Sequence, residues 1–285
     1  MTNLIKMELH RMFKMKCFYV IWIVLAVSIL VTTNFAVSEW KGFTLEERQE
    51  VHEMATEGMN EESEEYNLGM NVTTPTEPTK EISVYDMVFA NVKGKFILLI
   101  MVIFTILYST ADISSGYIKN IAGQIRDRKA LVYAKSICLF IYTILTMLFY
   151  IAAQIISNKI WVGEIYWGDK KSFFIYVAIE CALHFAFLTI VMLIATLLRN
   201  NVFSMALGVC MCMNIFLIVY GVVDKVAYKI GFEKFHLTNY TVTGKISLLG
   251  MDISQKAGGT AIIIAVIFAI AAVMLTGIIF DKRDI

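Results

Sequence analysis

The stretch FFIYVAIECALHFAFLTIVML, residues 173–193, decides the class of fold. An α-helix needs about 20 apolar residues to cross roughly 30 Å of hydrocarbon, and this stretch is long enough. The whole chain has the same character, because 58% of its 285 residues are hydrophobic and only 17% are charged. Soluble domains carry about 25% charged residues. The sequence therefore predicts an integral membrane protein.

Five further apolar runs indicate that this helix is one of six transmembrane helices in an all-α fold. The six predicted spans are 18–37, 96–114, 135–156, 172–198, 202–223 and 258–280. The polar segments before, between and after them are 1–17, 38–95, 115–134, 157–171, 224–257 and 281–285.

Basic residues set the predicted orientation of these spans. Taken together, the first, third and last polar segments are denser in Lys and Arg than the other three taken together, and such residues favour the cytoplasmic side. We therefore expect both termini in the cytoplasm, at a bacterial plasma membrane. Segment 38–95 is then a large acidic extracellular segment, 157–171 an extracellular loop and 224–257 an extracellular amphipathic segment.

The N-terminal segment has the pattern of a helix that lies in the inner headgroup layer of the membrane. Its basic residues share one arc of a helical wheel, and its apolar residues share the opposite arc. A plain positively charged anchor for the first span is the alternative. The apolar arc consists of Ile5, Leu9, Met12 and Phe13.

The segment 115–134 has the same pattern on a smaller scale. Gly116 breaks it from the preceding span, and the isoleucines that follow fall on one helical face. A basic cluster comes next, so the pattern predicts a short cytoplasmic helix that docks into a partner. An ordinary loop that obeys the charge rule is the alternative. The residues concerned are Ile118, Ile121, Ile125, Arg126, Arg128 and Lys129.

Several of these features together resemble the permease subunits of type-2 ABC transporters, the ABC-2 exporter-type family. An amphipathic N-terminal helix precedes six spans, and Asp112 follows the second span where the family more often has Glu. A glycine-containing turn (SSGYIKN), a basic run (RDRK), Lys135 at the start of the third span and the ending FDKRDI complete the resemblance.

The resemblance implies a coupling helix at about 115–128, seated in a groove of a separate cytoplasmic ABC ATPase subunit. It also implies that this partner binds ATP and Mg, and that two permease copies, identical or different, form the working unit in the lipid membrane. The implied ATPase-coupling residues are Asp112, Gly116, Ile118, Ile121, Ile125, Arg126, Arg128 and Lys129.

Other chemistry is not expected in this chain. It has no G-x-x-x-x-G-K-[ST], so we expect no nucleotide site, no enzymatic activity of its own and no cofactor. The motif H-E-x-x-H is missing, and Cys210 and Cys212 are two residues apart and do not share a helical face, so we expect no metal site. Nothing points to nucleic acid as a partner.

Polar residues inside the predicted spans are the candidates for a substrate path. Glu180 and His184 lie one helical turn apart, and Asn214 lies in the next span. Ionisable groups inside a membrane are costly and are functional candidates by default, although a polar contact between helices is the alternative.

We therefore expect a permease that exports, or extracts from the membrane, an amphipathic peptide, lipid or hydrophobic drug. The acidic segment 38–95 favours a cationic antimicrobial or toxin-like peptide. Two alternatives stay open. One is a membrane interaction or regulatory protein without transport activity, and the other is an ion-coupled secondary carrier that uses Glu180 and His184.

Overall fold

The described part of the chain folds into helices only, as the sequence predicts. The computed structural model describes residues 1–57, 72–114, 128–232 and 235–282. Its helices are α1 (Thr2–Lys14), α2 (Lys16–Gly42), α3 (Leu45–Glu57), α4 (Val84–Lys93), α5 (Phe96–Ser114), α7 (Lys129–Trp161), α8 (Lys170–Leu198), α9 (Asn201–Cys212), α10 (Phe216–Lys229), η1 (Leu237–Tyr240), α11 (Val242–Leu248) and α12 (Gln255–Asp281).

Four of these helices, α2, α7, α8 and α12, are long and apolar enough to cross a membrane. Two further pairs pass the same test only together, because α4 and α5 meet at 55° and α9 and α10 meet at 62°. The structure therefore has four candidate spans, or six if each bent pair is one span. These apolar helices indicate a membrane location, and the count of six spans stays a prediction.

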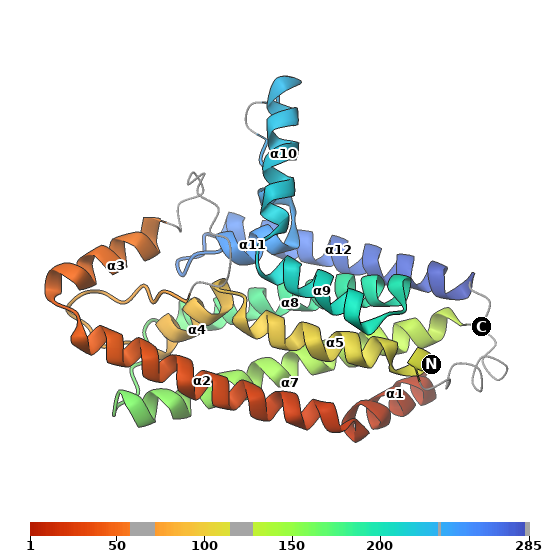
Figure 1. Ribbon diagram of the computed structural model, residues 1–285, viewed down its shortest axis with the longest axis horizontal. Helices are drawn as coiled ribbons and strands as arrows, with labels where there is room; N and C mark the ends of the chain where they lie inside the picture. Colours follow the sequence, from red (N-terminus) through yellow and green to blue (C-terminus); the bar gives the residue numbers. More distant parts are fainter. Residues whose placement is uncertain (58–71, 115–127, 233–234, 283–285) are drawn as a thin grey trace.

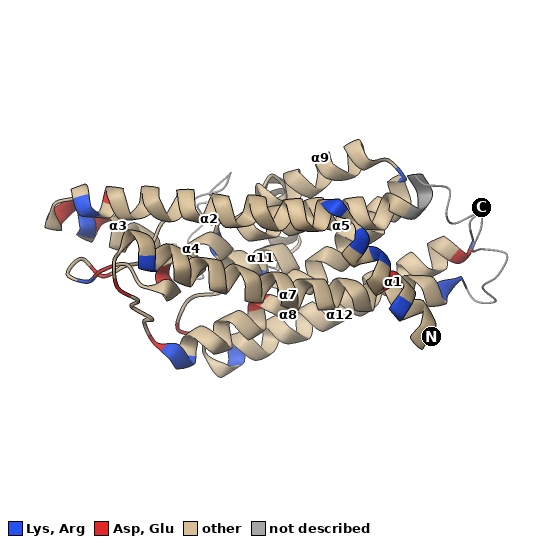
Figure 2. Ribbon diagram, turned by 90° about the horizontal axis from the view of Figure 1, so that it is seen from below, with Lys and Arg blue, Asp and Glu red and all other residues tan. Residues whose placement is uncertain are grey.

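The long helices run side by side in one elongated bundle (Figure 1). Helix α8 packs against α12, α5 and α7, while α2 packs against α7 and α9 against α5. Helix α1 and the C-terminal end of α12 lie at one end of the bundle, which we call the termini end (Figure 1). The opposite end holds α3. Acidic and basic residues gather towards the two ends, and the middle of the long helices is mostly free of them (Figure 2).

The stretch predicted as an extracellular segment, 38–95, contains the end of α2, all of α3 and all of α4. Helix α2 continues through its beginning to Gly42, and Trp40 packs with Ile82 and Met87 in a small apolar cluster. Helix α4 begins at a capping box made by Ser83 and Asp86 and is almost wholly buried. Its apolar sequence explains the burial, so this helix belongs to the bundle rather than to a surface loop.

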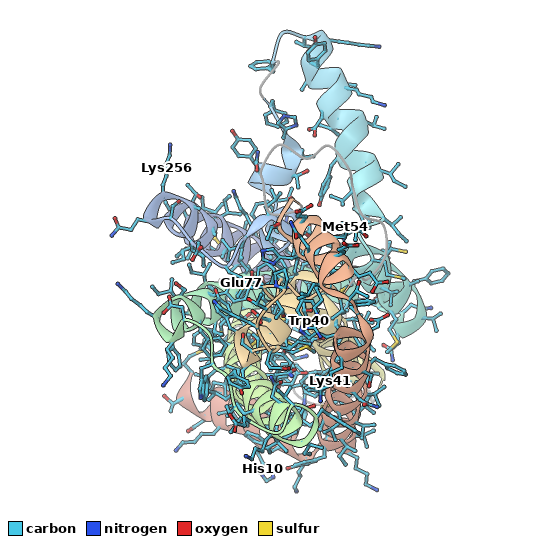
Figure 3. The ribbon with its side chains drawn as sticks, turned by 90° about the vertical axis from the view of Figure 1, so that its left-hand side faces the viewer. His10, Trp40, Lys41, Met54, Glu77 and Lys256 are labelled. Carbon is cyan, nitrogen blue, oxygen red and sulfur yellow. The ribbon has the colours of Figure 1, made fainter. Side chains whose placement is uncertain are left out.

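Helix α10 is the exception to this packing. It leaves the bundle at a steep angle in both Figure 1 and Figure 3, where its outer end lies far from the other helices. Its apolar side chains are exposed, among them Ile218, Val222 and Val226. The segment predicted as amphipathic, 224–257, returns from there to the bundle, and α11 packs against α8, α12 and α4.

A ladder of buried polar side chains joins α2, α4 and α7. The amide nitrogen of Gln154 donates to Thr33 Oγ1 at 3.0 Å and to Asn158 Oδ1 at 2.8 Å, and Asn91 donates to Gln154 Oε1 at 3.3 Å. Side-chain hydrogen bonds between helices are a common means of association where lipid removes the hydrophobic driving force.

Candidate functional site

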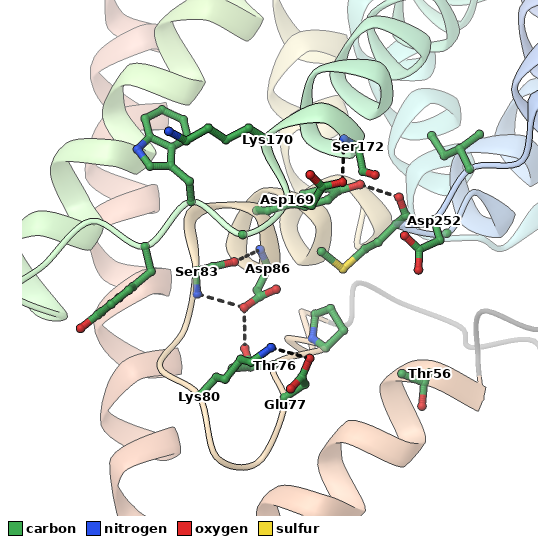
Figure 4. Close-up of a pocket in the computed structure, with 18 of the residues that line it drawn as sticks. Thr56, Thr76, Glu77, Lys80, Ser83, Asp86, Asp169, Lys170, Ser172 and Asp252 are labelled. Atoms are coloured by element: carbon green, nitrogen blue, oxygen red, sulfur yellow. Dashed lines mark hydrogen bonds and ion pairs between the residues drawn. The ribbon is translucent and has the colours of Figure 1, made fainter.

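A large cleft lies at the end of the bundle opposite the termini, with a volume of about 1290 Å³. Residues from α3, the segment before α4, the α7–α8 connection and the α11–α12 connection line it (Figure 4). Its lining holds more carboxylates than lysines, together with several aromatic rings. The carboxylates are Glu77, Glu81, Asp86, Asp169 and Asp252, the lysines are Lys80 and Lys170, and the rings include Tyr85, Tyr166 and Trp167.

Hydrogen bonds hold two of these carboxylates in place. Asp86 Oδ2 accepts from the backbone N–H of Ser83 at 2.9 Å and from Thr76 Oγ1 at 3.1 Å (Figure 4). Asp169 caps α8 and accepts from the backbone N–H groups of Lys171 and Ser172 at 3.2 and 3.1 Å. The bonds from Ser172 and then Lys171 lower the pKa of Asp169 below its usual value. The cleft therefore keeps the negative charge of Asp169 at a fixed position.

Tyr85 lines the cleft, and its ring belongs to a cluster of four aromatic rings. The Tyr85 ring lies 5.5 Å from that of Phe173 and 5.8 Å from that of Tyr176, and Phe89 lies 5.5 Å from Tyr176. The Tyr85 hydroxyl donates to the carbonyl of Met251 at 2.8 Å. These rings join the first turns of α4 to the first turns of α8.

Glu180 and His184 follow this aromatic cluster along α8. Tyr176, Glu180 and His184 follow one another at intervals of one turn on α8, and all three are at most 1% exposed. His184 Nδ1 donates to the carbonyl of Glu180 at 2.8 Å and lies 3.3 Å from Glu180 Oε2. Within the described part of the chain, neither Glu180 Oε1 nor His184 Nε2 has a hydrogen-bond partner.

Lys95 and Asn214 sit at the two breaks in the bent helix pairs. Lys95 separates α4 from α5 and Asn214 separates α9 from α10, and both have left-handed backbones, with φ of 57° and 60°. The ammonium of Lys95 donates to Asn214 Oδ1, so the two breaks are joined by one hydrogen bond. Lys95 is 1% exposed.

Of the three predicted substrate-path residues, the structure brings Glu180 and His184 into contact on α8, whereas Asn214 contacts Lys95 at the helix breaks. Sequence reasoning missed Lys95, because a lysine at the edge of an apolar run normally marks where a helix leaves the membrane. Asn214 offered a signal that was not used, since Asn is one of the few residues that often adopts a left-handed backbone.

A second polar cluster lies at the termini end. Glu8 on α1 is fully buried, and its Oε2 accepts from the Tyr108 hydroxyl on α5 at 2.8 Å and pairs with Arg11 at 3.0 Å. The Arg11 guanidinium and the Lys135 ammonium lie 5.3 and 5.8 Å from the centre of the Tyr108 ring. Lys135 also donates to the Ser109 carbonyl at 3.5 Å.

The buried face of α1 differs from the apolar arc that the sequence predicts. Met12 is fully buried, Leu9 packs against the core and Ile5 is half-buried, but Phe13 is 40% exposed and contacts the Phe18 ring. The buried face also contains Glu8, which the apolar pattern did not include. Glu8 can be buried because Tyr108 and Arg11 satisfy its charge.

The predicted coupling residues are only partly described. Gly116, Ile118, Ile121, Ile125 and Arg126 lie outside the described residues. Asp112 belongs to the last turn of α5 and Arg128 precedes the first residue of α7. Lys129 forms an ion pair with Asp281 at 3.4 Å and thereby joins the start of α7 to the end of α12.

No family model matches the chain, and a search of the curated proteins finds no relative.

All five cysteines are free thiols. Across 1–57, 72–114, 128–232 and 235–282, no group of three or more His, Cys, Asp or Glu is arranged to hold a metal ion.

Proposed function

We propose that the chain is the membrane subunit of an ATP-driven transporter of the ABC-2 type, energised by a separate ATPase subunit. The proposed orientation places the termini end in the cytoplasm and the cleft outside. The substrate is amphipathic, and the subunit exports it or extracts it from the membrane.

The observation that carries this proposal is how α1 is built into the bundle. Through Glu8 it contacts Tyr108 on α5, and the backbone carbonyl of Ile5 lies 3.9 Å from the Cys138 sulfur on α7. Helices α5 and α7 are the two that flank the predicted coupling loop. An ATPase that moves α1 or this loop therefore acts on the same two helices.

The route for substrate in this proposal begins at the cleft and continues past the aromatic cluster to Glu180. The two bent pairs are joined at their breaks by the hydrogen bond of Lys95 to Asn214. Broken helices at the centre of a bundle are a common place for substrate sites in membrane transporters.

The decisive experiment is purification of the tagged protein from its native host in mild detergent, followed by mass spectrometry. We expect an ATPase with a Walker motif in stoichiometric amount. The double variant Ile121→Asp/Ile125→Asp should still insert in the membrane but lose this partner and substrate-stimulated ATP hydrolysis, because the carboxylates disrupt an apolar docking face.

A matched control makes the same chemical change at the other end of the bundle. Leu45 and Met54 on α3 are 65% and 63% exposed, so Leu45→Asp/Met54→Asp should retain the ATPase. A protein that never co-purifies with an ATPase would overturn the proposal and favour a regulatory membrane protein. Transport without an ATPase that is lost in Glu180→Gln would favour the secondary carrier.

A further inference from the structure

We propose that the cleft at the α3 end of the bundle binds an amphipathic cationic peptide. Its basic side chains face the carboxylates of Asp169 and Asp252, and its apolar side chains lie on the apolar part of the cleft wall. This inference names the substrate class of the proposed function, and its physiological meaning rests on that function. The binding itself does not require the ATPase.

The size of the cleft is the first reason. Its volume of about 1290 Å³ exceeds the roughly 300–1,000 Å³ that is usual for the sites of drug-sized ligands. Four separate parts of the chain form its walls: α3, the segment before α4, the α7–α8 connection and the α11–α12 connection (Figure 4). The cavity therefore has room for a peptide segment that touches several walls at once.

The first turn of α4 holds two of these walls in place. The backbone N–H of Val84 donates to the carbonyl of Tyr166, in the α7–α8 connection, at 2.7 Å. The Tyr85 hydroxyl donates to the carbonyl of Met251, in the α11–α12 connection, at 2.8 Å. Both connections are thus fixed to one buried helix before any ligand arrives, and a preformed site lowers the ordering cost of binding.

The charge of the lining favours a cation. Lys80 pairs with Glu77 at 2.8 Å, so these two charges offset one another. Asp169 and Asp252 are exposed in the cleft and come from different walls, one just before α8 and the other before α12 (Figure 4). Each carboxylate has lone pairs for several donors, so Asp169 can accept an ammonium group in addition to the backbone of α8.

Apolar side chains lie in the same walls as these carboxylates. Trp167 precedes Asp169 by two residues, and Met251 and Ile253 flank Asp252. A ligand with both basic and apolar side chains can therefore meet both kinds of surface in one cavity. A small inorganic cation would leave the apolar part in contact with water, which is unfavourable.

The probe for this site is the synthetic peptide KLGKLGK labelled with tetramethylrhodamine, and the assay is fluorescence anisotropy with the full-length purified protein in detergent. Titration into protein-free micelles corrects for partitioning into the detergent. The peptide ELGELGE is the control for charge, and KGGKGGK is the control for the apolar side chains. No ATPase is present, so the result does not depend on the coupling partner.

We expect Asp169→Asn/Asp252→Asn to weaken the binding of KLGKLGK at least about fivefold, because it removes two ion pairs. The asparagine at 169 retains an oxygen that can cap α8, so the fold is kept. Glu46→Gln/Glu50→Gln removes the same charge at exposed positions of α3 outside the cleft and should bind as tightly as the wild type. KGGKGGK should bind the wild type at least about tenfold more weakly than KLGKLGK, because it buries no leucine.

Several outcomes would overturn the proposal. Equal binding of KLGKLGK and ELGELGE, or unchanged binding in Asp169→Asn/Asp252→Asn, would exclude the carboxylates as the site. Equal losses in that variant and in Glu46→Gln/Glu50→Gln would show a general effect of net charge. Equal binding of KLGKLGK and KGGKGGK would exclude an amphipathic ligand. If the double variant does not fold, Asp252→Asn alone should weaken binding at least about twofold, and unchanged binding there would refute the site.

The two proposals fail separately. If peptide binding does not depend on Asp169 and Asp252 while an ATPase co-purifies, the transporter proposal stands and the peptide site falls. If the peptide binds as expected but no ATPase is found, the site stands and the mode of energisation falls.

Discussion

The buried contact between Glu8 and Tyr108 gives the sharpest test of how α1 is attached to the bundle. Tyr108→Phe removes one hydrogen-bond donor from a fully buried carboxylate and leaves the ring in place. Hydrogen bonds to charged groups contribute about 1.5–3 kcal/mol, so we expect the free energy of unfolding to fall by that amount. Glu8→Ala removes the partner of Arg11 as well and should cost about 3–5 kcal/mol, as for other broken buried pairs.

The assay is unfolding by sodium dodecyl sulfate in mixed micelles, followed by circular dichroism of the helices. The double variant Glu8→Ala/Tyr108→Phe isolates the contact, since Tyr108→Phe should cost little once Glu8 is gone. We expect a coupling free energy of at least about 1 kcal/mol between the two changes. Tyr19→Phe is the matched control, because the Tyr19 ring on α2 is 52% exposed.

Additive effects would refute the contact. If the double variant loses the sum of the two single losses, within about 0.5 kcal/mol, Glu8 and Tyr108 do not interact and α1 is held by apolar packing alone. A Tyr19→Phe variant that loses as much as Tyr108→Phe would show that the assay reports general effects of removing a hydroxyl.

Two further changes test the cleft end. A Cβ at Gly244 would lie 1.9 Å from the carbonyl oxygen of Thr238. Gly244→Ala should therefore lower the free energy of unfolding by about 1–3 kcal/mol in the same assay. Gly259→Ala is the control and should not lower it, because a Cβ at Gly259 meets open space. Asp169 has a lowered pKa, so its cap on α8 is complete above the unfolded-state pKa of about 3.9 and is lost as the pH falls through the lower folded-state value. The wild type should therefore lose thermal stability in acid relative to Asp169→Asn, whose amide oxygen caps α8 at every pH; equal acid losses in the two proteins would contradict this role.

Apolar runs predicted the long helices because length and composition alone decide whether a segment can cross a membrane. The same reasoning failed to anticipate the breaks. The run 202–223 has no Pro, yet it divides at Asn214 into α9 and α10. The run 96–114 matched α5, but its partner α4 lay within a stretch read as a loop, because Asp86 and Lys93 interrupt its apolar pattern.

The candidate site was accessible to sequence reasoning only in part. Glu180 and His184 could be found because each is an ionisable group in the middle of an apolar run. Glu8 and Lys95 could not, since both lie near the ends of apolar segments, where charges are ordinary. Their burial depends on Tyr108 and Asn214, which are a hundred or more residues away in the chain. Only the packing of helices reveals such pairs.

The hydrogen bond between Lys95 and Asn214 couples the two bent helix pairs at their breaks. Helix α4 begins at Ser83, in the wall of the cleft, and ends next to Lys95. Helix α10 begins just beyond Asn214 and extends away from the bundle. A rotation of α10 about its break therefore either breaks the hydrogen bond between Lys95 and Asn214 or pulls on α4 through it. A movement of α4 also moves the wall of the cleft.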